Sequence, residues 1–418
     1  MAEASGRRVV VTGLGALTPL GLDMESTWEG LVDGRSGIAP ITFFDASAFP
    51  CPIAGELKGF EPTNYVDSKL LRRIDRSSVL AMAASRQAVE DAQLDLERQA
   101  PGSVGIVLGT GIGGAYMLVE NHQVMEERGA RRVSPFMITN SLPDTASGLV
   151  AIALGARGPN MAVTAACATG GAAVGEAAEL IRRGEAEVII AGGFEAPLRP
   201  LYYAGFAAMR ALAEHDDPKL ASRPFDADRN GFVISEGATV LILEELDHAL
   251  ARGAHIYAEW KGAATASDAL DMVASADDGR GVTHAMRQAL GSAGVDLDTV
   301  DYINAHGTST PMNDRVETHA IREVFGAHAD HLAVSSTKSM IGHMMGAAGA
   351  IEAAVAVLTC DRQVAPPTIN YRTPDPDCDL DYVPNEARPM EVRHAMSTSV
   401  GLGGHNSALL FGRWEDGA

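Results

Sequence analysis

Short runs of Val, Ile and Leu recur along the chain, and each leads into glycine and then into a stretch of small residues. These runs have few polar positions, so they lack the strict alternation of a strand with one face in water. They lie at 7–15, 103–111, 186–193, 239–245, 300–307, 331–338 and 407–412. Strands of this kind are covered on both faces, and the pattern therefore predicts a layered α/β fold with helices on both sides of a sheet.

Two segments share one pattern. Residues 162–181 (AVTAACATGGAAVGEAAELI) and 333–358 both read as a buried strand, a turn of small or hydroxyl residues and an alanine-rich helix. When Val163 is aligned with Val334, Cys167 falls opposite Lys338. This similarity is compatible with a chance likeness between two α/β units. If it reflects a duplication, the chain consists of two related halves joined near residue 258, which gives domains 1–258 and 259–418.

The composition narrows the class of protein. The 418 residues are 46% hydrophobic, which is ample for a large core, and the formal net charge is −21. So acidic a chain is a poor ligand for nucleic acid or for anionic membranes. No apolar run reaches the roughly 18–20 residues of a membrane span, and the N-terminus lacks a signal-peptide pattern. The four cysteines of the chain have no CxxC spacing, so we expect neither disulfides nor a zinc site. Together these features predict a cytoplasmic protein.

Cys167 lies among small residues in TAACATG (164–170), after a predicted strand and before a predicted helix. A cysteine in such surroundings is usually a packing residue. At the start of a helix, however, unpaired N–H groups and the helix dipole would lower its pKa and favour a nucleophilic thiolate. The small neighbours would then leave room for an acyl group.

His306 and His343 are the two histidines in unusual company, since both lie in glycine-rich loops that follow predicted strands. A lone histidine is more often a satisfied core residue than a catalyst. Two of them converging on one cysteine form a constellation suited to acyl transfer. The glycine-rich GTGIGG (109–114) also fits a dinucleotide fingerprint, but no ribose-binding acid follows at the right distance, which disfavours that interpretation.

Several motifs in this order make the chain resemble the β-ketoacyl-acyl carrier protein synthases of type II. The resemblance runs from VVVTGLGALTPLG (9–21) to SVGLGGHNSALLF (399–411), and thus covers nearly the whole chain. The motifs between them are GTGIGG, VSPF (133–136), TAACATG, AGGFEA (191–196), ASRPFDADRNGFVISEGA (221–238), NAHGTSTP (304–311), SSTKSMIGHMMGAAGA (335–350) and PPTIN (366–370). Their joint order and spacing is far more specific than any single motif.

The resemblance implies a thiolase-like fold, in which two duplicated halves stack as five αβαβα layers. Cys167 matches the family's nucleophile, and His306 and His343 match its catalytic histidines. Lys338 matches its lysine, and Glu317 the acid that holds this lysine. The backbone N–H groups of Cys167 and Leu402 would form the oxyanion hole.

The same resemblance implies a decarboxylative condensation. Cys167 would take an acyl chain from the phosphopantetheine arm of an acyl carrier protein, and the two histidines would stabilise the enolate of a malonyl-carrier as carbon dioxide leaves. Lys338 would act mainly by electrostatics and orientation. No metal and no redox cofactor is expected.

The implied partners are a small acidic carrier protein and a second ketosynthase-like chain, either an identical copy or a chain-length factor. Candidate docking residues for the carrier are the scarce, clustered cations of the chain, although ordinary surface charge would also explain any one of them. They are Lys69, Arg72, Arg73, Arg131, Arg132 and Arg210.

The C-terminal loop departs from the family pattern. Val400 and Leu402 stand where the family usually has two phenylalanines, and His405 replaces a smaller residue. Because leucine is smaller and more flexible than the usual gating phenylalanine, we expect a less strictly gated acyl pocket. Ile112 and Phe206 are the predicted walls of its acyl channel.

Three alternatives remain open at this stage. The chain could be the ketosynthase of a type II polyketide or polyene pathway that works beside a chain-length factor, which the altered loop favours. It could be a non-catalytic chain-length partner, but an intact Cys-His-His set argues against that. A cysteine hydrolase would need one histidine with an orienting amide or acid, and would leave the second histidine and Lys338 unexplained.

Overall fold

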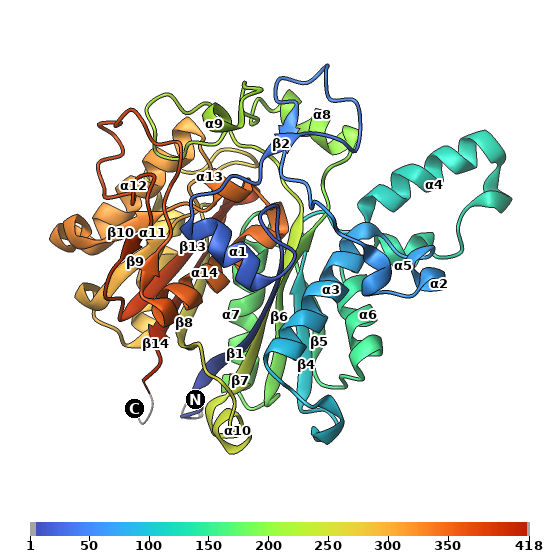
Figure 1. Cartoon of the computed structure of the whole chain (residues 1–418), viewed down its shortest axis with the longest axis horizontal. Helices are drawn as coiled ribbons and strands as arrows, with labels where there is room; N and C mark the ends of the chain where they lie inside the picture. Colours follow the sequence, from blue (N-terminus) through green and yellow to red (C-terminus); the bar gives the residue numbers. More distant parts are fainter. Residues whose placement is uncertain (1–5, 416–418) are drawn as a thin grey trace.

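One ten-stranded sheet runs through the described part of the chain, residues 6–415, in this computed structural model (Figure 1). From edge to edge its order is β10-β9-β13-β14-β8-β1-β7-β6-β4-β5. The strands are β1 (Val9–Leu17), β4 (Val104–Gly109), β5 (Asn160–Val163), β6 (Val188–Glu195), β7 (Gly237–Glu245), β8 (Ala258–Ser267), β9 (Val300–Asn304), β10 (Ala333–Ser335), β13 (His394–Gly401) and β14 (His405–Arg413). Two short pairs lie outside it, β2 (Ala39–Pro40) with β3 (Ile53–Ala54) and β11 (Val364–Ala365) with β12 (Arg388–Pro389).

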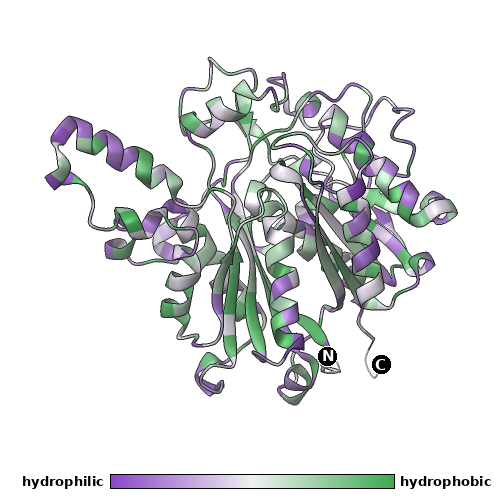
Figure 2. Cartoon of the chain, turned by 180° about the vertical axis from the view of Figure 1, so that it is seen from behind, coloured by the Kyte–Doolittle hydropathy of each residue, from purple (hydrophilic) through white to green (hydrophobic). Residues whose placement is uncertain are grey.

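The sheet repeats itself about its middle. Read inward from the two edges, β5-β4-β6-β7-β1 and β10-β9-β13-β14-β8 have the same chain order and the same pattern of parallel and antiparallel neighbours. The two sets are joined where Val9–Val11 of β1 pairs with residues 258–260 of β8. Figure 2 accordingly shows two sheet regions with helix between them. The edge strands β5 and β10 occupy equivalent places.

Helices complete five layers. In the middle, α7 (Thr169–Arg182) and α14 (Ala348–Arg362) pack on each other and on strands of both repeats. One outer layer contains α3 (Arg76–Asp91) and α6 (Thr145–Leu154), and the other contains α11 (Arg280–Ala293) and α12 (Pro311–Phe325). The expected thiolase-like αβαβα fold is therefore confirmed.

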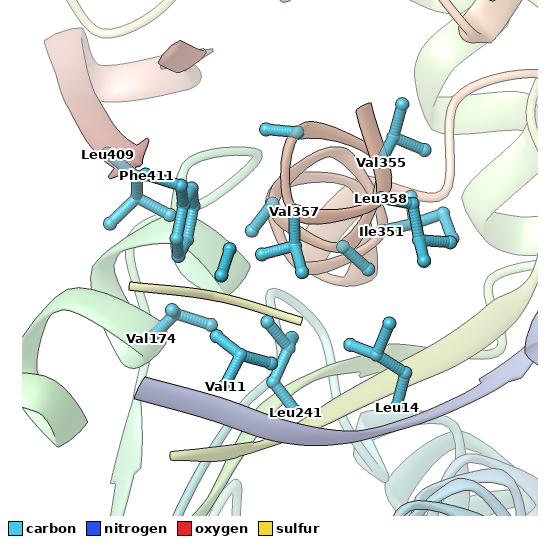
Figure 3. Close-up of a cluster of buried hydrophobic side chains, with 14 of the residues drawn as sticks. Val11, Leu14, Val174, Leu241, Ile351, Val355, Val357, Leu358, Leu409 and Phe411 are labelled. Carbon is cyan, nitrogen blue, oxygen red and sulfur yellow. The ribbon is translucent and has the colours of Figure 1, made fainter. Parts of the chain in front are cut away.

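The core is centred on the two middle helices. Figure 3 shows Val357 of α14 among Val11 of β1, Leu241 of β7, Val174 of α7 and Phe411 of β14, all of them buried. A helix that is apolar all round is typical of such a central layer. Their small residues let α7 and α14 approach closely: a Cβ on Gly170 would lie 2.4 Å from the Ala350 nitrogen.

The remaining helices lie around this frame. They are α1 (Met24–Val32), α2 (Ser68–Leu71), α4 (Ala115–Arg128), α5 (Met137–Ser141), α8 (Pro200–Ala208), α9 (Pro218–Ala221), α10 (Leu246–Ala251) and α13 (Lys338–Ile341). The helix α4 projects from the body as an arm (Figure 1). Within residues 6–415, no helix combines the length and the apolar character needed to cross a bilayer.

Each of the seven apolar runs contains a strand, as the hydrophobic pattern predicts. The pattern does not reveal β8 and β13, whose sequences AEWKGAATAS and HAMSTSVG are rich in small and hydroxyl residues. Alanine, glycine and serine, which make up much of both sequences, have little intrinsic preference for strands, so these two strands depend on their neighbours in the sheet and on the packing of α11 and α14.

Candidate active site

One cavity of about 180 Å³ brings together the three side chains singled out by the sequence. Cys167 comes from the loop between β5 and α7, and His306 from the loop after β9. His343 comes from the turn after α13 rather than from a loop directly after a strand. The cavity thus combines loops of both repeats at one end of the sheet.

The loop that carries Cys167 is tightly constrained. Ala166 has a φ of +48°, which is uncommon for a residue with a Cβ. Gly401 packs against this loop so closely that a Cβ there would lie 3.1 Å from the Cys167 nitrogen. The N–H of Leu402 donates a hydrogen bond to the Cys167 sulfur. Within residues 6–415, the Cys167 N–H has no backbone acceptor, so two N–H groups are available beside the sulfur.

Burial raises the pKa of the Cys167 thiol to about 11, although Lys338 and the Leu402 N–H act in the opposite direction. The expectation of a lowered pKa at the start of a helix is therefore wrong. The helix α7 begins at Thr169, and removal of the sulfur from water outweighs the nearby donors. The group that faces the cavity is a neutral thiol.

The ring of His343 is fixed by its own turn. The Met345 N–H donates to Nδ1 of His343 at 3.3 Å, so Nδ1 is an acceptor and Nε2 carries the hydrogen. The ring meets Phe232 edge to face at a centroid distance of 5.3 Å, and meets His306 in the same way at 5.4 Å. Nε2–H is the polar group that this histidine has left to offer a ligand.

His306 has the same tautomer for a different reason. Lys338 Nζ lies 3.2 Å from Nδ1 of His306, and because an ammonium has donors only, Nδ1 must accept. Burial and the charge of Lys338 hold the pKa of both imidazoles well below the usual value. The cavity therefore presents two neutral rings, each with an N–H donor on Nε2.

The acid that pairs with Lys338 is Glu352, not Glu317 as the resemblance implies. Glu352 lies in α14, one layer inward, and both partners are buried. Glu317 of α12 instead accepts the N–H groups of His306 and Gly307 at 2.7 and 2.8 Å, and the Thr398 hydroxyl. It therefore builds the loop of His306 rather than holding the lysine.

The glycine-rich GTGIGG loop has an internal occupant. Its N–H groups at Gly111, Ile112 and Gly113 donate to the carboxylate of Glu195, as does the Thr110 hydroxyl. A nest of backbone N–H groups is an anion site, and here a side chain of the same protein fills it. This explains why a dinucleotide-like motif occurs without the rest of a dinucleotide site. Glu195 and Glu352 carry no local sequence signal because their partners are distant in the chain.

Only some of the residues predicted to form the walls of the cavity line it. Phe206, Val400 and Leu402 line it, as expected. Ile112 is not among the residues that line it. The mouth also carries neutral polar groups and flexible apolar side chains that the sequence analysis did not single out. These include Met209, Val273, Ser275, Thr308, Thr310, Met312 and Asn313.

The predicted carrier-binding cations lie on three separate elements. Lys69, Arg72 and Arg73 are in or just after α2, and Arg210 follows α8 beside Met209 of the cavity mouth. Arg131 and Arg132 follow the projecting α4 arm (Figure 1). All six are exposed, and none forms an ion pair with a residue that the structure describes.

Two family profiles match this chain. The profile described as "Beta-ketoacyl synthase, N-terminal domain" matches residues 6–249, and the one described as "Beta-ketoacyl synthase, C-terminal domain" matches residues 257–372. Together they cover the cysteine and both histidines of the cavity. The chain belongs to the beta-ketoacyl synthase family. Members of this family are condensing acyltransferases, so this synthase is an enzyme.

Its relatives extend over the whole length. The 3-oxoacyl-[acyl-carrier-protein] synthase 2 of Synechocystis sp. is 50% identical over 416 residues, which is 99% of this chain and 100% of that protein. Among solved structures, the ishigamide ketosynthase/chain length factor has a TM-score of 0.91 at 36% identity, over 98% of this chain and 100% of that one. A type II polyketide ketosynthase, in complex with its acyl-carrier protein and bound to a hexaketide, has a TM-score of 0.91 at 34% identity over the same shares.

Proposed function

We propose that this synthase joins a malonyl-carrier to an acyl chain held on Cys167, with loss of carbon dioxide. The observation that carries the proposal is the cavity itself. It holds a thiol, two N–H groups beside the sulfur and two neutral imidazoles whose Nε2–H atoms are free to donate. This set serves both an acyl transfer and an enolate, and it exceeds what a hydrolase needs.

In the first half-reaction the Cys167 sulfur attacks the thioester carbonyl of an acyl-carrier. The bond between the acyl carbon and the pantetheine sulfur breaks, and the released pantetheine thiolate takes up the proton that Cys167 gives up. The N–H groups of Cys167 and Leu402 stabilise the oxyanion that forms on the carbonyl.

In the second half-reaction His306 and His343 donate their Nε2–H bonds to the thioester oxygen of the malonyl group. Carbon dioxide leaves, and the electron pair of the broken carbon–carbon bond becomes the enolate. Its carbon attacks the acyl carbonyl on Cys167. The bond to sulfur breaks with its electron pair on the sulfur, and this thiolate takes up a proton from solvent, which restores the resting thiol. Lys338 acts through His306 by fixing its tautomer, which makes it an orienting residue.

We divide this chemistry between the proposed halves, 1–258 and 259–418. The first contributes Cys167, and the second contributes His306, His343, Lys338 and Leu402. The strand repeat about the β1–β8 junction supports this boundary.

The substrate arm enters over a mouth of mixed character. Hydroxyls of Thr308 and Thr310 suit the amides of a phosphopantetheine arm, and Met209 and Met312 adapt to its apolar parts. Val400 and Leu402 form a gate with less bulk than a pair of aromatic rings, which suits acyl chains of varied size. The six exposed cations supply the charge that an acidic carrier recognises, and we expect this binding to weaken with salt.

We expect a second chain to cover the exposed apolar side chains of α5 and α6. Ile138 of α5 is 62% exposed and Ile152 of α6 is 82% exposed, and β5 leaves one edge of the sheet unpaired. Large exposed apolar groups beside an open edge are typical of an interface. We propose a homodimer, in the cytoplasm, where the four free cysteines remain reduced.

The second candidate is a ketosynthase of a type II polyketide pathway that pairs with a chain-length factor. The altered gate, Val400 and Leu402, supports it, as does the likeness to the ishigamide ketosynthase/chain length factor. Native mass spectrometry of the purified chain separates the two: a stable homodimer supports the first candidate, and a monomer that assembles only with a cysteine-less relative supports the second.

The proposal is tested with malonyl-carrier and acyl-carriers of several chain lengths, with products read by mass spectrometry. Cys167→Ala and Cys167→Gln are expected to abolish the acyl-enzyme and the condensation. Cys167→Gln is expected to retain decarboxylation of malonyl-carrier, because the histidines remain. Condensation by either variant would contradict the assignment.

A further inference from the structure

Glu195, the last residue of β6, is a buried carboxylate with an unusual set of partners. It accepts backbone N–H groups from Gly111 at 2.7 Å, from Ile112 and Gly113 at 3.1 Å, and from Gly346 at 3.1 Å. Thr110 adds a hydroxyl at 2.8 Å. No Lys, Arg or His among residues 6–415 forms an ion pair with it. Burial raises the pKa of this carboxyl group, while the Thr110 hydroxyl and the backbone N–H groups act in the opposite direction by stabilising its charge.

One of these bonds reaches the turn of His343. Gly346 follows Met345, whose N–H fixes the tautomer of His343 and whose φ of +46° marks a constrained turn. Space at this point is so limited that a Cβ on Gly346 would lie 2.4 Å from the Gly111 nitrogen and 2.6 Å from Glu195 Oε2. The carboxylate therefore clamps the His343 turn directly onto the 110–113 loop.

The other bonds lead toward Cys167. The Thr110 N–H donates to the carbonyl of Val163, and the Thr164 hydroxyl donates to the carbonyl of Thr110. The 110–113 loop is thus fastened to the end of β5, whose last residue, Val163, lies four residues before the nucleophile at Cys167. Glu195 itself does not line the cavity.

We infer that Glu195 is a positioning residue of the condensing site, whose carboxylate sets the His343 turn and the Cys167 loop in place relative to each other. This inference rests on the roles proposed above for Cys167 and His343. The three tied segments come from different parts of the chain, and the carboxylate is the group that bonds to both the 110–113 loop and Gly346.

The negative charge of Glu195 acts on the pKa of Cys167, which allows the positioning role to be tested by titration of the sulfur. Glu195 raises the pKa of Cys167, as Glu352 does, while Lys338 lowers it. A neutral amide at position 195 removes one of the two negative charges and also offers a donor where the N–H groups need an acceptor. The sulfur should therefore become more acidic while the geometry for condensation deteriorates, two changes of opposite sign.

The test compares Glu195→Gln and Glu195→Asp with the matched control Glu244→Gln. Glu244 is also buried and bonded to several groups, but it lies on β7 with Thr12, His248 and Arg252 as partners. Two quantities are measured on the full-length protein: the pH profile of Cys167 alkylation by iodoacetamide, and the condensation kinetics.

For Glu195→Gln the alkylation profile is expected to move to lower pH by about half a unit, which is roughly a threefold faster reaction at a given pH below the pKa. The kcat of condensation is expected to fall at least about tenfold, with little change in KM for the malonyl-carrier. Glu195→Asp retains the charge, so its alkylation profile should match the wild type while its kcat falls. Glu244→Gln should change neither quantity.

The inference is overturned if Glu195→Gln keeps both the wild-type profile and the wild-type kcat, or if Glu244→Gln produces the same shift. Should Glu195→Gln not fold, Glu195→Asp decides: a wild-type kcat overturns the inference, and a reduced kcat at unchanged KM supports it. The alkylation profile needs no condensing activity. If the proposed function failed, the wild type would not condense, yet the profile would still report on Glu195.

Discussion

The two edges of the sheet have the same frame and different chemistry. At one edge β5 leads to Cys167 and α7, and at the other β10 leads to Lys338 and α14. Residues 164–168 connect the first pair, whereas residues 336–347 connect the second. Cys167 lines the cavity, whereas the side chain of Lys338 is 1% exposed and hydrogen-bonded to Glu352 and His306.

The longer connection explains the difference. Its additional residues form α13 and the turn with His343, which carries the second histidine to the cysteine of the other repeat. Lys338 then lies behind His306 instead of facing the cavity, and it fixes the tautomer of that histidine. Cys167, at the equivalent position of the other repeat, presents its sulfur to the cavity. A duplicated frame can thus assign the reacting atom to one copy and its support to the other.

The largest effect is expected from Lys338→Met, which removes the contacts of the lysine with His306 and Glu352. Decarboxylation should fall at least about 100-fold because His306 loses the donor that fixes its tautomer. Loss of one partner of a buried ion pair should lower the free energy of unfolding by about 3–5 kcal/mol. Urea unfolding and a carbon dioxide assay measure the two.

This loss of stability should depend on pH. Burial raises the pKa of Glu352 to about 7 even beside Lys338, so without the lysine the folded protein holds a proton that the unfolded chain releases. Stability should then decrease as the pH rises from about 4.5, the ordinary pKa of this carboxyl, to its raised pKa, which lies above about 7 once Lys338 is removed. A second substitution, Glu352→Gln, should restore most of the stability and none of the activity. A single variant as stable as the wild type would contradict this account.

The next effect separates the histidines from the nucleophile. In a Cys167→Gln background, His306→Ala should reduce decarboxylation at least about 100-fold, because the enolate loses one of its two N–H donors. His328→Ala is the matched control, since His328 bonds to the Val300 carbonyl away from the cavity. Equal loss in both variants would show that the effect is not specific to the site.

A smaller and graded effect concerns the sulfur. With a pKa of about 11, the alkylation rate of Cys167 should rise about tenfold for each pH unit between roughly pH 7 and pH 10, because the thiolate fraction does. Cys167→Ala is the control, and its three remaining cysteines are buried. A plateau at or below pH 8 would mean that the donors at the start of α7 outweigh burial.

The smallest effect is expected at the gate. Leu402→Phe restores an aromatic ring beside the cavity and should narrow the range of acyl chains that are elongated, with a shift in the product profile rather than a loss of turnover. Competition between acyl-carriers of different length measures it. An unchanged profile would count against a gating role for Leu402.

Local sequence patterns predict many of the strands and helices, but they do not reveal the hydrogen bonds between residues that are remote in sequence. The strands with Val- and Ile-rich sequences are evident, as are Cys167 at the end of β5 and α7 after it. The strands β8 and β13 are not, because Ala, Gly and Ser become strand residues only when neighbouring strands pair with them.

The site shows the same limit. Motif order leads to Cys167, His306 and His343. The resemblance, however, implies Glu317 as the acid that holds Lys338, whereas Lys338 pairs with Glu352 and Glu317 accepts the His306 N–H. No local pattern reveals Glu195, because its partners at 110–113 and 346 are remote in sequence. The position of Cys167 before a helix predicts a lowered pKa, but burial, which depends on the whole fold, raises it.

The most direct test of the central claim is the mass of the protein after incubation with an acyl-carrier alone. The account predicts an increase equal to one acyl group, located by peptide mapping to Cys167 and absent from Cys167→Ala. An acyl group on another residue, or acylation that survives in Cys167→Ala, would contradict it.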